Sequence, residues 1–206
     1  MSSESDDSGT EFGRLVILSG PSGTGKSTVL RKLLRDCELP LTLSVSATTR
    51  APRAGETEGK DYFFLTDHEF EQRRQAGEFL EYKEVFGLGR WYGTLRSQVA
   101  SGLKQGKWVI LEIDVQGALA VLEKQEFDPI TIFIHPGGMN ELEYRLRARE
   151  TETEEVILAR LETAASEMRY LPHYQHEVIN GVVDEAVAEI CQILKDQKEK
   201  HPCSKS

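Results

Sequence analysis

The stretch RLVILSGPSGTGKSTVLRKLLRD, residues 14–36, limits the possible folds more than any other part of the chain. It opens with a continuous apolar run, which is typical of a strand buried on both faces of a parallel sheet. It closes with a valine and leucines repeated every three or four positions, which indicates a helix with one apolar face. The small and polar residues GPSGTGKS separate the two. The stretch therefore predicts a strand, a glycine-rich loop and a helix, the opening unit of an α/β fold.

The glycine-rich loop matches the pattern G-x4-G-K-[ST] between a strand and a helix, which is the context in which this pattern binds phosphate. Backbone N–H groups and the helix N-terminus then converge on phosphate oxygens. We expect Lys26 to reach the β- and γ-phosphates of a nucleoside triphosphate and the Ser27 hydroxyl to ligate Mg²⁺. The predicted ATP-binding residues are Gly20, Pro21, Ser22, Gly23, Thr24, Gly25, Lys26, Ser27 and Thr28.

Two further apolar runs, residues 107–114 and 129–135, alternate with helical patterns in the rest of the chain. Buried strands that alternate with helices predict a parallel sheet flanked by helices. Residues 41–94 are richer in short strands and predict an inserted subdomain, and the arginine-rich residues 137–151 predict a lid. The expected divisions are a disordered acidic N-terminus at 1–12, a core at 13–40, 95–136 and 152–198, the insert at 41–94, the lid at 137–151, and a tail at 199–206.

The 206-residue chain is long enough for one domain with a sizeable core, and its net charge is −9. That charge argues against a broad nucleic-acid-binding surface and against binding to an anionic membrane. The N-terminus lacks the features of a signal peptide, and no apolar run approaches the ~20 residues of a membrane span. Cys37, Cys191 and Cys203 are odd in number and widely spaced, so we expect neither a disulfide framework nor a zinc site. We expect a cytoplasmic protein in a reducing setting, either a monomer or a small homo-oligomer.

The segment SATTRAPRAGETEGKDYFF, residues 46–64, gathers positive charge in a loop of an acidic chain. Arg50 and Arg53 lie three residues apart there, and arginine suits phosphate because its planar fork makes bidentate, charge-assisted hydrogen bonds. Tyr62 and Tyr92 can add hydroxyl donors. The chain has no N-K-x-D pattern of the kind that GTPases use to read guanine. A second phosphate site beside an ATP loop indicates a kinase for a small phosphorylated acceptor.

Five segments together resemble guanylate kinases, and they occur in the order of that family: GPSGTGKST, SATTRAPRAGETEGKDYFF, WYGT, LEIDVQG and RLRARETETEE. The resemblance runs from about Leu15 to Ile190. It implies a P-loop kinase fold with a small GMP-binding insert and an Arg-rich lid. It also implies transfer of a phosphoryl group from ATP to GMP, with Mg²⁺ accompanying the ATP and with these two nucleotides as the small-molecule substrates.

The same resemblance gives roles to individual residues. The implied GMP-binding residues are Ser46, Arg50, Arg53, Tyr62, Glu81, Tyr92, Thr94 and Asp114. The implied catalytic residues are Lys26, Arg50, Asp114, Arg145, Arg149 and Arg160. Within the first set the arginines and tyrosines correspond to phosphate ligands, and Ser46 and Glu81, with Thr94 beside them, to guanine ligands. Elementary chemistry agrees for Glu81, because a carboxylate accepts both adjacent guanine donors, N1–H and N2–H₂, whereas adenine has an acceptor at N1.

Two features keep alternatives open at single residues. FGLGRWYGT is about two residues longer than the family's usual segment, so Glu84 stays a second candidate for reading guanine. Arg145 and Arg149 lie in a highly charged stretch, and the plain alternative for them is a solvated helix face paired with glutamates.

Two other functions stay open for the whole chain. The first is a guanylate-kinase-like interaction domain that binds phosphopeptides through the arginine loop, and the intact Lys26 and Ser27 count against it. The second is a related P-loop kinase for another phosphorylated acceptor, such as a ribose bisphosphate or a different nucleotide. Turnover of ATP tests the first alternative, and a panel of acceptors tests the second.

Overall fold

The computed structural model describes residues 13–85, 89–148 and 153–200. The expected acidic N-terminus at 1–12 lies outside the described residues, and so does Arg149. Of the expected tail at 199–206, the structure describes two residues, and both continue the last helix.

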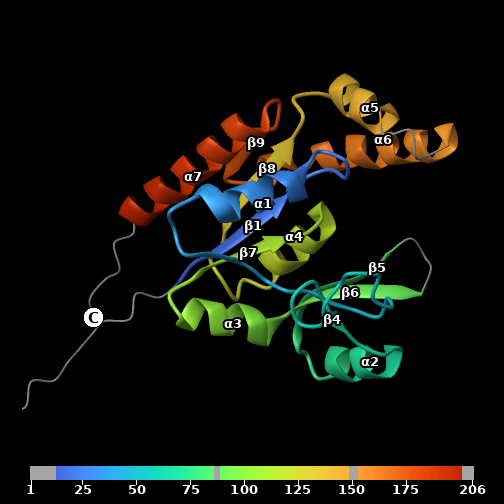
Figure 1. Ribbon diagram of the computed structural model, residues 1–206, viewed down its shortest axis with the longest axis vertical. Helices are drawn as coiled ribbons and strands as arrows, with labels where there is room; N and C mark the ends of the chain where they lie inside the picture. The colour runs from blue at the N-terminus through green and yellow to red at the C-terminus, as the bar shows by residue number, and fades with distance from the viewer. Residues whose placement is uncertain (1–12, 86–88, 149–152, 201–206) are drawn as a thin grey trace, which may run out of the picture.

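Five strands form the central sheet in the order β2-β7-β1-β8-β9, and every neighbouring pair is parallel. The strands are β1 (Leu15–Ser19), β2 (Leu41–Leu43), β7 (Trp108–Glu112), β8 (Ile130–His135) and β9 (His176–Ile179). The order places β1 in the middle, with β7 on one side and β8 on the other (Figure 1). Connections on opposite sides of a central strand open a crevice at its carboxyl end, where α/β folds bind ligands. The predicted parallel α/β fold is confirmed.

Helices cover both faces of this sheet because the residues of a strand alternate between its two sides. Two helices lie on each side: α1 (Lys26–Asp36) with α7 (Val183–Lys200), and α3 (Arg96–Lys104) with α4 (Val115–Glu123). Val16 and Leu18 of β1 are fully buried in the core that α1 and α7 close. Leu15 and Ile17 are buried in the core that α3 and α4 close. The continuous apolar run of β1 follows from this, since both of its faces are inside.

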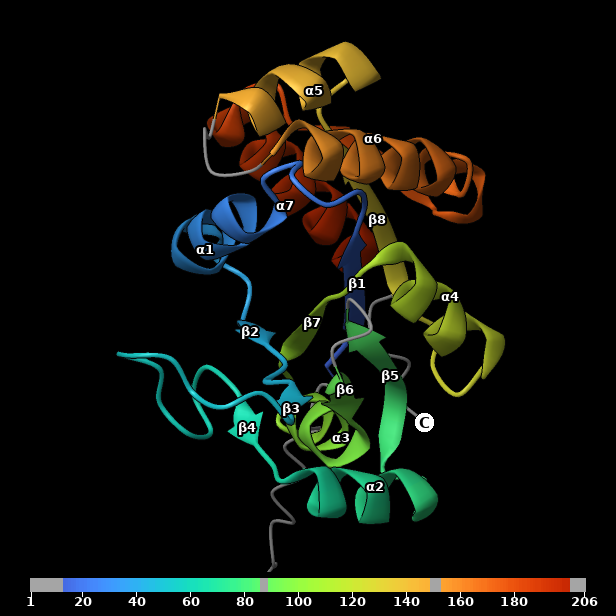
Figure 2. The same ribbon diagram turned by 90° about the vertical axis from the view of Figure 1, so that its right-hand side faces the viewer.

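A second, four-stranded sheet has the order β4-β3-β6-β5 and lies at one end of the central sheet (Figure 2). Its elements are β3 (Ala47–Thr48), β4 (Phe63–Phe64), α2 (Asp67–Gln75), β5 (Phe79–Val85) and β6 (Arg90–Leu95). Phe70 of α2 stacks on Phe79 at a centroid distance of 4.5 Å, which closes a small separate core. A capping box of Thr66 and Glu69 forms at the start of α2. Strand β2 falls within the stretch 41–94 but pairs with β7, so the second sheet begins only at β3.

The remaining helices are α5 (Met139–Arg147), α6 (Glu154–Met168) and the short η1 (Leu171–His173). Helices α5 and α6 pack on one another through Leu142, Leu146 and Ile157, and they lie at the end of the molecule opposite the second sheet (Figure 2). Leu146 also lies against the glycine-rich loop, where a Cβ on Gly23 would come within 2.8 Å of it. Helix α5, which carries Arg145 and Arg147, is thereby placed beside the glycine-rich loop.

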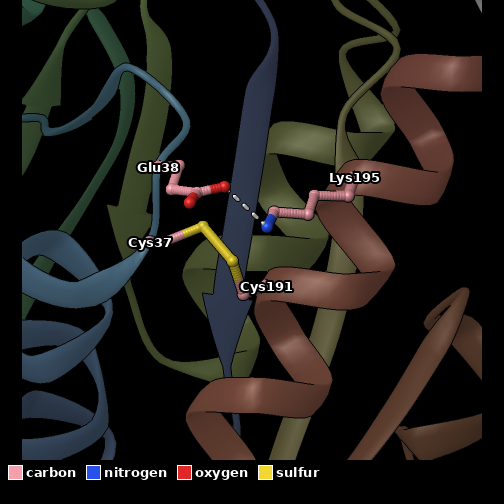
Figure 3. The surroundings of a disulfide bond; sticks show 4 residues. All are labelled: Cys37, Glu38, Cys191 and Lys195. Atoms are coloured by element: carbon pink, nitrogen blue, oxygen red, sulfur yellow. Dashed lines mark hydrogen bonds and ion pairs between the residues drawn. A yellow bond between two sulfur atoms is a disulfide. The ribbon is translucent and has the colours of Figure 1, made fainter.

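A disulfide joins Cys37, the C-cap of α1, to Cys191 in α7 (Figure 3). The two Cα atoms are 5.9 Å apart although 154 residues separate them in sequence, and Lys195 pairs with Glu38 beside the bond at 2.9 Å. The expectation of no disulfide was wrong. Its basis was the scattered spacing of the cysteines, which carries no information about two helices that pack side by side on one face of a sheet.

Candidate active site

The glycine-rich loop leaves the carboxyl end of β1 and turns into the N-terminus of α1. Gly20, Gly23 and Gly25 have φ angles of +138°, +90° and +88°, which side-chain-bearing residues rarely adopt. A Cβ on Gly20 would also come within 2.0 Å of the Ile134 carbonyl oxygen. Above the loop lies a cavity of about 780 Å³, and seven of the nine predicted ATP-binding residues line it. These are Gly20, Ser22, Gly23, Gly25, Lys26, Ser27 and Thr28.

Pro21 and Thr24, the other two residues predicted to bind ATP, do not line the cavity. Both are buried, and the Thr24 carbonyl oxygen accepts a hydrogen bond from Asn180 Nδ2 at 2.8 Å. They therefore lie on the side of the loop away from the cavity, and Asn180, just after β9, supports the loop through Thr24.

Lys26 is the first residue of α1, and its ammonium folds back over the loop. It donates to the carbonyl oxygens of Gly20 at 2.6 Å and Pro21 at 2.8 Å. Burial lowers the pKa of Lys26, and the nearby carboxylates, Glu112 first among them, act in the opposite direction. The ammonium therefore lies in a partly desolvated site, where its attraction for an anion is screened less than it is in water.

Ser27 and Glu112 place a hydroxyl and a carboxylate oxygen side by side in the same cavity. The Ser27 hydroxyl donates to Glu112 Oε1 at 2.5 Å, and both residues line the cavity with the glycine-rich loop. Mg²⁺ is typically held by one or two such protein oxygens together with phosphates and water, so this pair fits Mg²⁺ carried by a nucleotide. Among the described residues no group of three or more His, Cys, Asp or Glu side chains is arranged to hold a metal ion by itself.

A second cavity, of about 180 Å³, lies between the two sheets and is lined by Ser46, Tyr62, Glu81, Lys83, Tyr92, Gly93, Glu112, Ile113 and Asp114. Five of these residues also line the first cavity: Tyr62, Lys83, Glu112, Ile113 and Asp114. The two cavities therefore share a wall. Most of the residues expected to bind the acceptor nucleotide line the smaller one, on the side of the second sheet.

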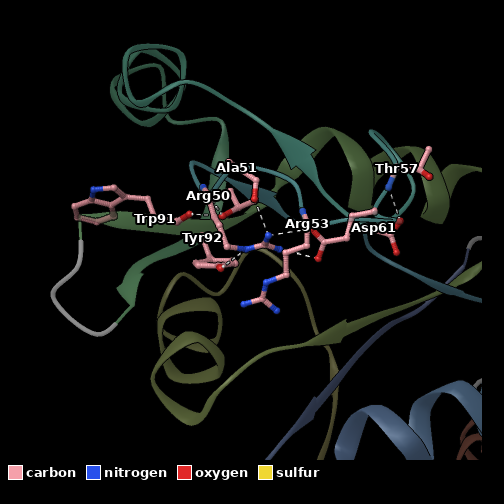
Figure 4. Close-up of polar contacts among 9 residues, drawn as sticks. Arg50, Ala51, Arg53, Thr57, Asp61, Trp91 and Tyr92 are labelled. Atoms are coloured by element: carbon pink, nitrogen blue, oxygen red, sulfur yellow. Dashed lines mark hydrogen bonds and ion pairs between the residues drawn. The ribbon is translucent and has the colours of Figure 1, made fainter.

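Arg50 is buried, with 7% of its surface exposed, and its guanidinium is held in one orientation (Figure 4). It donates to the Tyr92 hydroxyl at 3.1 Å, to the Ala51 carbonyl at 2.7 Å, and to both carboxylate oxygens of Glu56 at 2.9 and 2.8 Å. The pKa of Arg50 is raised, mainly by Glu56. Glu56 also accepts from the backbone amide of Arg53 at 2.7 Å. One carboxylate thus organises the loop that carries both arginines.

Glu81 is the buried carboxylate of the second cavity, with 8% of its surface exposed. Its Oε1 accepts from the Thr94 hydroxyl at 2.6 Å, and burial raises its pKa. A Cβ on Gly117 would come within 3.2 Å of its Oε2, so the glycine makes room for it. Glu84 is an odd number of residues away on the same strand and accepts instead from the Gly89 amide at 2.8 Å. Of the two candidates for reading guanine, the structure places only Glu81 in the cavity.

Asp114 lies where the two cavities meet and makes two bonds. Its Oδ1 accepts from the Gly117 amide at 2.8 Å and caps α4, and its Oδ2 accepts from Lys83 Nζ at 2.5 Å. Capping fixes the carboxylate relative to the central sheet, and the bond to Lys83 joins it to the second sheet.

Of the three arginines predicted in and near the lid, the structure describes two, and only one of them lines a cavity. Arg160 of α6 lines the larger cavity and donates to the Ser22 hydroxyl at 2.8 Å. Arg145 of α5 pairs with Glu141 at 2.7 Å on its own helix and does not line either cavity, which is the helix-face arrangement. Arg149 lies outside the described residues.

Comparisons with known proteins agree with this geometry. The family model for guanylate kinase matches residues 12–197. The chain belongs to the guanylate kinase family.

Relatives and a solved structure show how close the match to guanylate kinases is. A guanylate kinase of Rhodopirellula baltica is 62% identical over 205 residues, which cover 100% of this chain and 98% of the relative. A guanylate kinase of Clostridium tetani is 46% identical over 91% of this chain and 88% of the relative. The crystal structure of a guanylate kinase from Anaplasma phagocytophilum superimposes with a TM-score of 0.70 at 36% identity, over 91% of this chain and 87% of that one. Within the described residues of this guanylate kinase family member, no helix is long and apolar enough to cross a membrane.

Sequence reasoning missed three charged residues of this guanylate kinase site: Glu56, Lys83 and Glu167. Glu167 lines the larger cavity, and its buried Oε2 has no hydrogen-bond partner among the described residues. Burial raises its pKa, against the attraction of Lys26. Strand alternation from Glu81 signals Lys83, which lies two residues further along β5. Glu56 belongs to the segment SATTRAPRAGETEGKDYFF that carries the resemblance, but no role was assigned to it. No local pattern signals Glu167, because α6 carries several other acids.

Proposed function

We propose that this chain catalyses transfer of the γ-phosphate of ATP to GMP, giving ADP and GDP. The observation that carries the proposal is the shared wall between the two cavities. One cavity is lined by the glycine-rich loop, and the other by Glu81 and Tyr92. A phosphate in the first cavity and an acceptor in the second would face each other across that wall.

On the donor side, the loop amides and Lys26 bind the phosphates of ATP, as the strand–loop–helix arrangement favours. For this, the Lys26 ammonium exchanges the carbonyl oxygens of Gly20 and Pro21 for phosphate oxygens. Ser27 and Glu112 would hold Mg²⁺, directly or through water, and the ion would neutralise charge on the β- and γ-phosphates.

On the acceptor side, Glu81 with Ser46 and Thr94 reads the guanine edge, and Arg50, Arg53, Tyr62 and Tyr92 bind the phosphate. The burial of Glu81 supports base selectivity, because an acceptor that lacks N1–H would leave the carboxylate unpaired. The fixed orientation of Arg50 supports phosphate binding, since a preorganised donor loses little freedom when the anion arrives. Asp114 lies between the acceptor and the Mg²⁺-binding side.

Phosphoryl transfer then requires alignment and positive charge rather than covalent help from the protein. Arg160 lies in the donor cavity and supplies part of that charge. For Arg145 and Arg149 the proposal rests on the resemblance of RLRARETETEE to the family's lid. It requires Arg145 to exchange Glu141 for phosphate when the lid closes. Closure would also exclude water and so limit hydrolysis of ATP.

The setting belongs to the same proposal. We propose a cytoplasmic protein, because ATP and GMP are found there, acting as a monomer or small homo-oligomer. The net charge of −9 supports small-molecule partners rather than nucleic acid or an anionic membrane.

The test is to measure turnover of ATP, in the presence of Mg²⁺, with each of three acceptors: GMP, AMP and a ribose bisphosphate. We expect kcat/KM for GMP to exceed that for AMP by about 10⁴-fold, as in sites built to hydrogen-bond one substrate. Lys26→Ala should retain less than about a tenth of the wild-type turnover, because Lys26 contacts only the donor phosphates, and should still bind GMP. Preference for another acceptor would identify a different kinase. A folded protein that binds GMP but turns over no ATP would indicate the phosphopeptide-binding alternative.

A further inference from the structure

Lys83 lies on the same face of β5 as Glu81, because residues two apart on a strand point to the same side. The register of the second sheet places Glu81 opposite Thr94 and Lys83 opposite Tyr92. Cross-strand partners also share a face. This face of the second sheet therefore carries two rows, one of Glu81 and Thr94 and the next of Lys83 and Tyr92, and all of them except Thr94 line the smaller cavity.

The first row is the one proposed to read the base, and the second contains the hydroxyl proposed to bind the phosphate. Tyr92 accepts the Nε–H of Arg50 at 3.1 Å, so its own hydroxyl hydrogen remains available to donate to an anion. Lys83 is the cross-strand partner of Tyr92, and both side chains line the smaller cavity. Lys83 would therefore lie beside the phosphate end of the bound nucleotide, one row beyond the residues proposed to contact the base.

The charges of the side chains that line the smaller cavity show why a cation at Lys83 matters for a phosphate there. Three carboxylates line it, those of Glu81, Glu112 and Asp114, and Lys83 is the only lysine or arginine among the described residues that does so. Arg50 does not line this cavity, and Glu56 and Ala51 accept three of its hydrogen bonds. A phosphate that entered this cavity would face three carboxylates, and Lys83 is the cationic side chain among the lining residues that can oppose them.

We propose that Lys83 binds the phosphate of the acceptor nucleotide, with Asp114 holding its ammonium in position; this inference rests on the proposed function. An ammonium has three donors, and the bond to Asp114 Oδ2 at 2.5 Å uses one, which leaves two for phosphate oxygens. The side chain is 46% exposed, so it is reachable by a ligand. Lys83 also lines the donor cavity, and the same charge therefore lies beside the phosphate that receives the transferred group.

The experiment compares GMP with guanosine, which has the same base and ribose but no phosphate. Dissociation constants are measured by calorimetry, with guanosine as a competitor where its binding is weak, for the wild type and for Lys83→Met, Lys83→Gln and Lys83→Arg. We expect both neutral variants to weaken GMP about 10- to 100-fold and to change guanosine by less than about twofold. Lys83→Arg should keep most of the GMP affinity. KM for GMP should rise in parallel, while KM for ATP stays within about twofold.

Lys104→Met is the matched control, because Lys104 is an exposed lysine at the end of α3 that lines neither cavity. It should leave both dissociation constants unchanged. Equal weakening of GMP and guanosine in the neutral variants would show that Lys83 only ties the two sheets together, and unchanged GMP binding would show no role; either result overturns the inference. Failure of the proposed function is a separate outcome, because it appears as absent GMP turnover in the wild type.

Discussion

In the proposed site, recognition of guanine depends on one buried carboxylate, that of Glu81. Two influences on its pKa oppose each other: burial raises it and the hydrogen bond from Thr94 lowers it. Burial is the larger, so the pKa lies above the ordinary 4.5. Only the ionised form accepts both guanine donors. Protonation at mildly acidic pH would therefore remove an acceptor from the site.

We predict that kcat/KM for GMP falls on the acid side with an apparent pKa above 4.5. Because the folded-state pKa is raised, protonation of this group favours the folded protein as the pH falls, so the loss should not come from unfolding at Glu81. The measurement is the pH profile of kcat/KM with thermal melting at each pH. Glu81→Gln should have a low kcat/KM for GMP and no such acid limb. The same limb in both proteins would assign it to another group.

The loop between β3 and β4 shows how an irregular element acquires one conformation. Glu56 binds the Arg50 guanidinium through both oxygens and the Arg53 amide through one of them. The Arg50 guanidinium also lies 5.4 Å from the ring centre of Tyr62, within the range of a cation–π contact. These contacts replace the backbone ladder that the loop lacks.

For this element we predict that Arg50→Ala and Arg53→Ala weaken GMP about 10- to 100-fold and change ATP affinity by less than about threefold. Arg50→Ala should have the larger effect, because it also leaves Glu56 without its partner beside the incoming phosphate. Arg73→Ala, which removes an exposed arginine from α2, is the control. Calorimetry with each nucleotide gives the comparison. Equal losses for GMP and ATP would contradict a dedicated acceptor site.

At the scale of the whole molecule, the two cavities depend on how the two sheets and the helices are assembled. The central sheet supplies the glycine-rich loop and Glu112, the second sheet supplies Glu81 and Lys83, and α6 supplies Arg160. On the face covered by α1 and α7, the bond between Cys37 and Cys191 closes a loop of 154 residues. A crosslink across so long a loop restricts the unfolded chain strongly.

We predict that the oxidised protein is more stable to urea than the reduced protein by about 2–5 kcal/mol. Reducing agent should have no such effect on Cys37→Ser or Cys191→Ser, which should match the reduced wild type. Cys203→Ser is the control and should keep the full response. Because the cytoplasm keeps most protein thiols reduced, the two forms should also be compared in GMP turnover. A wild type that responds to reducing agent no more than Cys37→Ser would contradict the disulfide.

Features encoded within a few neighbouring residues were predictable from the sequence. The apolar run before Gly20 and the helical repeat after Ser27 predicted β1 and α1 and the loop between them, because burial on two faces and the period of a helix leave local patterns. The capping box of Thr66 and Glu69 was predictable for the same reason. The ordered motifs identified the family, and strand alternation would have added Lys83 to the site.

Only the tertiary structure decided which distant residues meet. It paired β2 with β7 rather than with the second sheet, joined Cys37 to Cys191, and placed Arg160 in the donor cavity while leaving Arg145 on Glu141. It also chose Glu56, among many acids, as the partner of Arg50. For the distant pairs the physical reason is that they meet only when sheets and helices pack, and residues far apart in sequence leave no shared pattern. For Arg50 and Arg145, whose partners lie six and four residues away, several acids are within reach and the fold selects one of them.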